Sequence, residues 1–116
     1  DGIRDSVASR GLGDVYKRQV HTVFFWLKSD ISKDDRDFFF QEVNALAGIE
    51  SVKGFYCGRP ASTPPREVVD TSYDCGLSVI LSDMSGHDAY QDHPIHHRFI
   101  QNCSHLWEKV RIYDAD

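Results

Sequence analysis

The sequence predicts an α+β domain with the ferredoxin-like element order β-α-β-β-α-β. Four short segments rich in β-branched and aromatic residues alternate with helical segments in this order. In addition, the first of these strands carries apolar side chains on both faces, although helices in this fold cover only one face of the sheet. We therefore expect the uncovered faces of two copies to pack together as a homodimer.

The first strand is predicted over residues 20–28, VHTVFFWLK, because β-branched and aromatic residues dominate this segment. Alternation along the strand assigns one set of side chains to the face that the helices cover: His21, Val23, Phe25 and Leu27. Alternation places Phe24 and Trp26 on the opposite face. These two aromatic residues are expected to meet the second copy.

A helix is expected to begin at Ser32, which forms a capping-box-like start with Asp35. Its inner face is defined by apolar residues at helical spacing: Phe39, Val43, Leu46 and Ala47. Gly48 is a suitable end for this helix. Residues 51–58, SVKGFYCG, then read as the second strand, which its glycines weaken.

The third and fourth strands follow a long connection. Residues 60–71 contain three prolines and predict an extended loop, long for so small a domain. The third strand is expected over residues 72–82, with an inward set made of Tyr73, Cys75, Leu77, Val79 and Leu81. Residues 106–113, LWEKVRIY, complete the sheet as the fourth strand.

The second helical region is broken at Pro94. Proline has no backbone N–H, and its ring clashes with the preceding helical turn. A helix must therefore end near Asp92, and another must begin at Pro94. On an unbroken helix Tyr90 and His96 would point in different directions, because six residues correspond to about 600° of rotation. The break allows the phenol and the imidazole to converge.

The first nineteen residues resemble the translation of a sequencing-library adapter. Residues 14–19, DVYKRQ, match a translated transposase end, and residues 9–13 and 1–5 match the adapter arm and the outer primer in their correct order. A flexible leader is the alternative, and the glycine, serine and arginine content fits it. We therefore expect residues 1–19 to be an artefactual or disordered leader, and residues 20–116 to be a single domain.

Composition and charge exclude several kinds of partner. The net charge of −5 argues against a nucleic-acid partner, which requires a basic face. No apolar run approaches the roughly 18 residues that would span a membrane. The three cysteines are scattered and show no CxxC spacing, so we expect free thiols in the reducing cytoplasm.

No metal or other cofactor is expected from the sequence. His93, His96 and His97 lie close together, and imidazole is a common metal ligand. However, helical phase turns His97 outward, and no carboxylate or thiol stands beside these histidines at ligand spacing.

Five segments together resemble the stress-responsive dimeric α/β-barrel family, called Dabb. In chain order they are HTVFFWLK at residues 21–28, YDxxL from Tyr73, AYQxHPxH at residues 89–96, Phe99, and LWEKVxIYD at residues 106–114. The resemblance covers nearly all of residues 20–116, and HPxH is its most specific part. It implies a homodimer that forms a dimeric α/β barrel, with a small-molecule pocket between the sheet and the helices of each subunit.

The resemblance also implies which residues form the pocket. The family includes a plant polyketide cyclase that uses a tyrosine and a histidine without a cofactor; by the AYQxHPxH motif these fall on Tyr90 and His96, and a further pocket histidine falls on His21. The implied substrate-binding wall is Val23, Phe25, Phe39, Val43, Leu77, Val79, Phe99 and Trp107. Where the cyclase has a second tyrosine on its first helix, this chain has Val43.

Three classes of function remain open at this point. A histidine among apolar side chains is held neutral and suits a general base, while a tyrosine can donate to a carbonyl or enolate oxygen. These roles fit a cofactor-independent cyclase, isomerase or lyase acting on a small apolar carbonyl compound. The alternatives are a non-catalytic, stress-associated binder or dimer, and a cofactor-independent monooxygenase. The binder or dimer would use the same cavity. A purely structural alternative is that His96 caps or packs the short helix, Tyr90 fills the core and His21 is a hydrogen-bonded core residue.

Overall fold

The computed structural model describes residues 18–116 and has the predicted element order. The elements are β1 (Gln19–Leu27), α2 (Lys33–Ala45), η1 (Leu46–Gly48), β2 (Val52–Gly58), β3 (Cys75–Leu81), α3 (Met84–Asp92), α4 (Pro94–Cys103), η2 (Ser104–Leu106) and β4 (Trp107–Ala115). The predicted leader lies outside the described residues except for positions 18 and 19. Of these, Gln19 already pairs with Leu81 as the first residue of β1.

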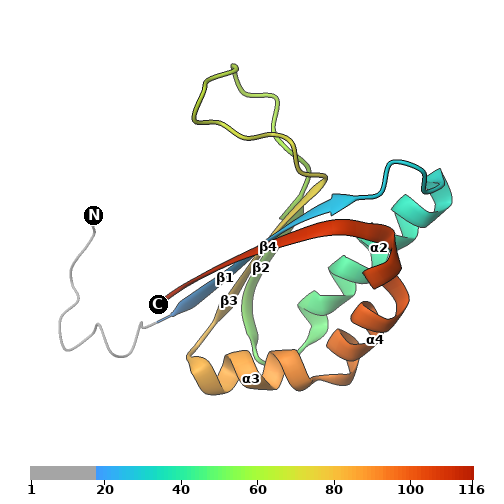
Figure 1. Ribbon diagram of the computed structural model, residues 1–116. Coiled ribbons are helices and arrows are strands. Elements are labelled where there is room, and N and C mark those ends of the chain that lie inside the picture. The colour runs from blue at the N-terminus through green and yellow to red at the C-terminus, as the bar shows by residue number, and fades with distance from the viewer. Residues whose placement is uncertain (1–17) are drawn as a thin grey trace.

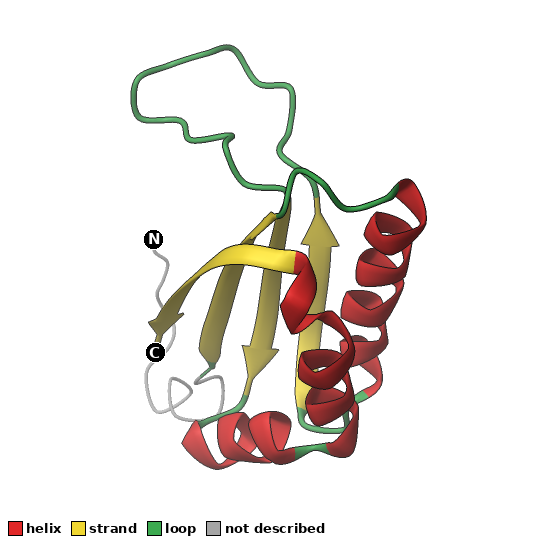
Figure 2. Ribbon diagram, turned by 45° about the vertical axis from the view of Figure 1, so that its right-hand side comes forward, coloured by secondary structure: helices red, strands yellow, loops and turns green. Residues whose placement is uncertain are grey.

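The four strands form one antiparallel sheet in the order β2-β3-β1-β4. This topology confirms the ferredoxin-like α+β fold. The helices lie together on one side of the sheet, and no helix of residues 18–116 covers the other side (Figures 1 and 2). We call this second side the open face. None of the described helices is long and apolar enough to cross a membrane.

Strand β1 has the two faces that its alternation predicts. Its burial alternates along its whole length, and His21, Val23, Phe25 and Leu27 are all buried beneath the helices. On the other side, Phe24 and Trp26 remain partly exposed. Helix α2 contributes the buried Phe39 and Val43 to the core. Ser32 caps the start of this helix by accepting a hydrogen bond from the backbone N–H of Asp35 at 3.0 Å.

Pro94 divides the second helical region as expected. Helix α3 ends at Asp92, and His93 adopts the extended backbone that a residue before proline favours. The His93 ring then caps α4, because its Nδ1 accepts a hydrogen bond from the backbone N–H of Ile95 at 3.1 Å. Figure 2 shows the two helices meeting at an angle under the sheet.

The inward placement of Tyr73 was wrong. Strand β3 begins only at Cys75, so the strand alternation does not extend back to Tyr73. Its ring lies on the open face instead, in edge contact with Phe24 at a centroid distance of 4.8 Å. Gly76 makes room for the ring, because a Cβ atom there would come within 3.2 Å of it. The segment between β2 and β3 projects from the end of the sheet as the long loop that the prolines predict (Figure 1).

Candidate functional site

A cavity of about 130 Å³ lies between the sheet and the helices α3 and α4. Most of its wall is apolar or aromatic, and the polar groups that reach it come from two histidines, a tyrosine and a glutamine. The lining residues are His21, Val23, Phe25, Leu46, Leu77, Tyr90, Gln91, His96, Phe99, Ile100, Trp107, Val110 and Ile112. An apolar cavity with a few convergent polar groups is the usual form of a small-molecule site.

Eight of the eleven residues implied by the resemblance line this cavity. They are His21, Tyr90 and His96 together with Val23, Phe25, Leu77, Phe99 and Trp107. The remaining three, Phe39, Val43 and Val79, do not line it among the described residues, because they are fully buried in the core. Phe39 supports the wall from behind: its ring packs against Phe25 and Phe99, at centroid distances of 5.2 Å and 5.9 Å.

Tyr90 and His96 meet across the helix break. Their ring centroids are 5.0 Å apart, with an edge-on interplanar angle of 71°. His21 reaches the same place from β1, and its ring lies 5.7 Å from that of Tyr90. The three polar side chains that the family motif singles out therefore form one contiguous group at the cavity wall.

Burial keeps both helix-borne groups uncharged at neutral pH. Desolvation, with smaller contributions from the neighbouring His21, His97 and His87, lowers the pKa of His96 to about 4. Burial also raises the pKa of Tyr90 well above its ordinary value. At pH 7 the site therefore offers a neutral imidazole beside a protonated phenol.

The lowered pKa of His96 predicts a loss of stability at acid pH. An unfolded histidine titrates near 6.5, whereas folded His96 titrates near 4, so between these values the unfolded state binds more protons. The free energy of unfolding should therefore fall as the pH is lowered from about 7 to about 4, by about 2 kcal/mol after allowance for partial exposure. Urea denaturation across this range should show a shallower pH dependence for His96→Gln; an unchanged slope would contradict the prediction.

Asp114 is a site residue that sequence reasoning left without a role. The antiparallel register of β1 and β4 places it directly opposite His21, and its Oδ1 lies 2.5 Å from His21 Nδ1. This contact fixes the orientation of the buried His21 imidazole. The pairing depends on the register of two strands more than ninety residues apart, so no local sequence pattern could have identified it.

His87, for which the sequence suggested no role in the site, lies directly beside it. Its ring lies 4.9 Å from that of His21, and its Nε2 is 3.5 Å from Gln91 Nε2. The spacing of three residues between His87 and Tyr90 puts both on one face of α3. That spacing is the signal that could have identified His87.

The histidines first considered as metal ligands have other surroundings. His93 caps α4 and its Nε2 lies 3.1 Å from Glu50, while His97 is exposed. A different set, His21, His87 and Asp114, places one possible ligand atom from each residue within 4.8 Å of the others.

Solved structures of other proteins share the fold of this chain. A Dabb family protein with a ferredoxin-like fold from Mesorhizobium loti is 26% identical, with a TM-score of 0.69, and the match covers 85% of this chain and 95% of that one. A dimeric ferredoxin-like protein of unknown function from Thermobifida fusca is 19% identical, with a TM-score of 0.69 and coverage of 84% and 89%. A hydroxynitrile lyase from Passiflora edulis is 17% identical, with a TM-score of 0.72 and coverage of 85% and 92%.

The sequence also matches a family model, although it matches no individual curated protein. The family model described as the Stress responsive A/B Barrel Domain matches residues 20–116, which is most of the chain and includes every cavity-lining residue. The protein therefore belongs to the stress-responsive A/B barrel family, Dabb.

Proposed function

We propose that the protein binds a small apolar carbonyl compound in this cavity and acts on it by cofactor-independent acid–base chemistry, as a cyclase, isomerase or lyase. One observation carries the proposal: a neutral imidazole, His96, and a protonated phenol, Tyr90, are in contact at the wall of an otherwise apolar cavity. A perturbed pair in a cleft is a recognised pointer to function.

The roles follow from the protonation states. His96 is uncharged and can accept the proton from the carbon next to a bound carbonyl group. Tyr90 keeps its proton and can donate a hydrogen bond to the carbonyl oxygen while negative charge develops there. His21, held by Asp114, completes the polar side of the cavity. The proton taken up by His96 then returns to the product, so the enzyme ends unchanged.

The size of the cavity limits the ligand. A cavity of roughly this volume holds a single benzene ring, whereas sites for drug-sized ligands are several times larger. We therefore infer a ligand with about one ring or its aliphatic equivalent. The likeness to a protein described as a hydroxynitrile lyase supports lyase chemistry on small compounds as one member of the proposed class.

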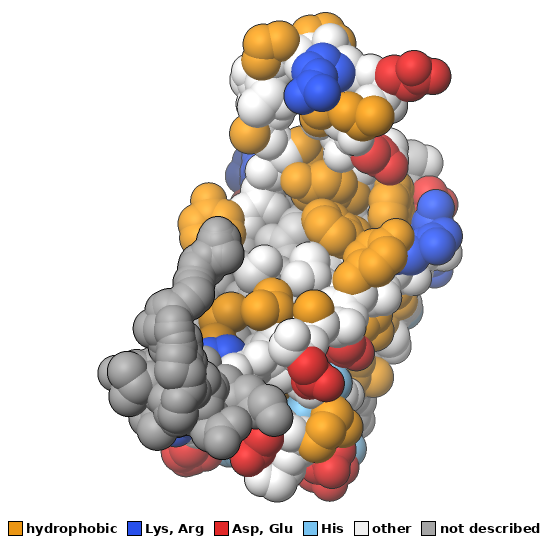
Figure 3. Space-filling view, turned by 90° about the vertical axis from the view of Figure 1, so that its left-hand side faces the viewer, with side chains coloured by type: hydrophobic (Ala, Val, Ile, Leu, Met, Phe, Trp, Pro, Cys, Tyr) orange, Lys and Arg blue, Asp and Glu red, His pale blue; other side chains and the backbone are white. Residues whose placement is uncertain are grey.

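We further infer that the protein is a homodimer joined through its open face. Tyr56 on β2 and Tyr113 on β4 are 72% and 58% exposed on this face, and Phe24 and Trp26 lie between them. Figure 3 views the molecule from this side and shows apolar side chains gathered over its middle. Three of the solved structures with this fold are described as dimeric. An apolar area of this kind marks an interface.

The thiols support a reducing compartment such as the cytoplasm. Cys57 and Cys75 lie on neighbouring strands with their sulfur atoms 3.4 Å apart, and both are free thiols, as is Cys103. An oxidising compartment would favour oxidation of such a pair.

The proposed chemistry can be tested with phenylacetone, a one-ring apolar ketone with exchangeable α-protons. The protein in D₂O is expected to accelerate exchange of these protons, measured by NMR. Tyr90→Phe and His96→Gln should each lower the exchange rate at least tenfold, because each removes one of the two proton-handling groups. The exposed His105→Gln is the matched control and should leave the rate unchanged.

Binding is measured in the same samples from the chemical shifts of the ketone. Binding without accelerated exchange would favour the non-catalytic binder. Exchange that both variants retain would remove Tyr90 and His96 from the proposed roles.

A further inference from the structure

We propose that His21, His87 and Asp114 form a binding site for a divalent transition-metal ion, at the end of the cavity where β1, β4 and α3 meet. This inference goes beyond the proposed acid–base function, which requires no ion. It also differs from the sequence-based expectation, which considered only the histidines around Pro94.

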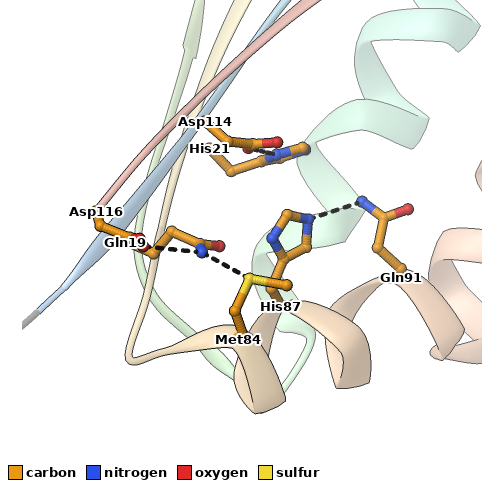
Figure 4. Close-up of polar contacts among 7 residues, drawn as sticks. All are labelled: Gln19, His21, Met84, His87, Gln91, Asp114 and Asp116. Carbon is orange, nitrogen blue, oxygen red and sulfur yellow. Dashed lines mark hydrogen bonds and ion pairs between the residues drawn. The ribbon is translucent and has the colours of Figure 1, made fainter.

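Three elements bring the ligands together. His21 is buried on β1, Asp114 lies opposite it on β4, and His87 approaches from α3 (Figure 4). One possible ligand atom from each residue lies within 4.8 Å of the others. Ligands of a first-row ion bound at about 2.0–2.2 Å lie closer together than this upper limit. The possible ligand atoms must therefore shift slightly when an ion binds. The Asp114 side chain, which is 43% exposed, can rotate to allow this shift.

The surroundings of His87 provide an independent observation. Its Nδ1 is buried and has no hydrogen-bond partner among the described residues. A buried polar atom without a hydrogen-bond partner is destabilising, so such atoms call for a ligand, an ion or a water molecule. The Oε1 atom of Gln19, whose amide nitrogen donates to Met84 Sδ on the same helix as His87, is likewise buried without a partner in the described part of the chain (Figure 4).

The donor set indicates the class of ion. Two imidazoles and one carboxylate suit zinc and the neighbouring ions cobalt, nickel and iron(II), and disfavour calcium or magnesium, which prefer oxygen ligands. Three protein ligands leave at least one coordination position for water or a small anion. The exposed side of Asp114 provides a path by which the ion could enter.

Cobalt(II) is a suitable probe because its visible absorption reports imidazole ligands and low coordination number. We expect the tag-free full chain, dialysed against chelator, to bind one Co²⁺ per chain with a new visible absorption band, and Zn²⁺ to displace it. His87→Gln and Asp114→Asn should each raise the dissociation constant at least tenfold, measured by calorimetry. His97→Gln, which changes an exposed histidine outside the cluster, should bind as the unchanged protein does.

Two results would overturn the site: no saturable Co²⁺ binding to the unchanged protein, or full binding by His87→Gln. Circular dichroism establishes that each variant is folded, and double replacement of His97 and His105 identifies any adventitious surface binding. The phenylacetone assay is run with chelator present. Loss of the metal site therefore leaves the proposed acid–base function standing, and absence of exchange leaves the metal site standing.

Discussion

Replacing Phe24 by Asp is expected to abolish the proposed homodimer and leave a monomer. Phe24 lies at the middle of the open face, where its ring makes edge contacts with Tyr73 and Tyr113 at centroid distances of 4.8 Å and 6.3 Å. In a dimer joined through this face, two new carboxylates would be buried without partners. Each costs several kcal/mol, so the dissociation constant should rise by a factor of at least about one hundred.

Analytical ultracentrifugation at micromolar concentration measures this change. Phe38→Asp is the matched control, because Phe38 is 37% exposed on α2, away from the open face, and undergoes the same chemical replacement. That variant should remain dimeric. If Phe24→Asp remained dimeric as well, the interface would lie elsewhere on the molecule. A dimer lost equally in both variants would indicate destabilised folding, which their melting temperatures would reveal.

The elements and their faces could be predicted because they depend on neighbours in sequence. The alternation of β1 assigns Phe25 and Phe24 to opposite faces whatever the rest of the chain does. The chemistry of proline requires a break at Pro94 in any helix that reaches it. Tyr73 shows the limit of this reasoning, since alternation holds only where the strand itself continues, and β3 starts two residues later.

The composition of the site could be predicted only in part, because it depends on how distant elements dock. Val43 and Val79 face inward as expected, but in this packing they fill the core rather than border the cavity. Whether an inward side chain meets a neighbour or a void is decided by the placement of α3 and α4 on the sheet. For the same reason, the contacts of His21 with Asp114 and His87 appear only once the strand register and the helix position are known.

Phe39→Ala is expected to destabilise the folded protein by about 3–5 kcal/mol, the range found when a buried phenylalanine is truncated. Phe39 is 0% exposed, and its ring contacts Phe25, Phe99 and Trp107, which all line the cavity. Truncation therefore removes buried apolar area and leaves a void directly behind the cavity wall. The wall should loosen as well, so any ligand that the cavity binds should bind more weakly.

Chemical denaturation at one fixed protein concentration measures the effect, since the stability of a dimer depends on concentration. Phe38→Ala is the matched control one residue away. Its ring is 37% exposed, so its loss should lower the free energy of unfolding by clearly less, about 1–2 kcal/mol. The difference between the losses of stability in these two variants tests whether the inner face of α2 supports the cavity wall. Equal effects would mean that α2 packs on the sheet in a different rotation, and that the cavity has a different boundary.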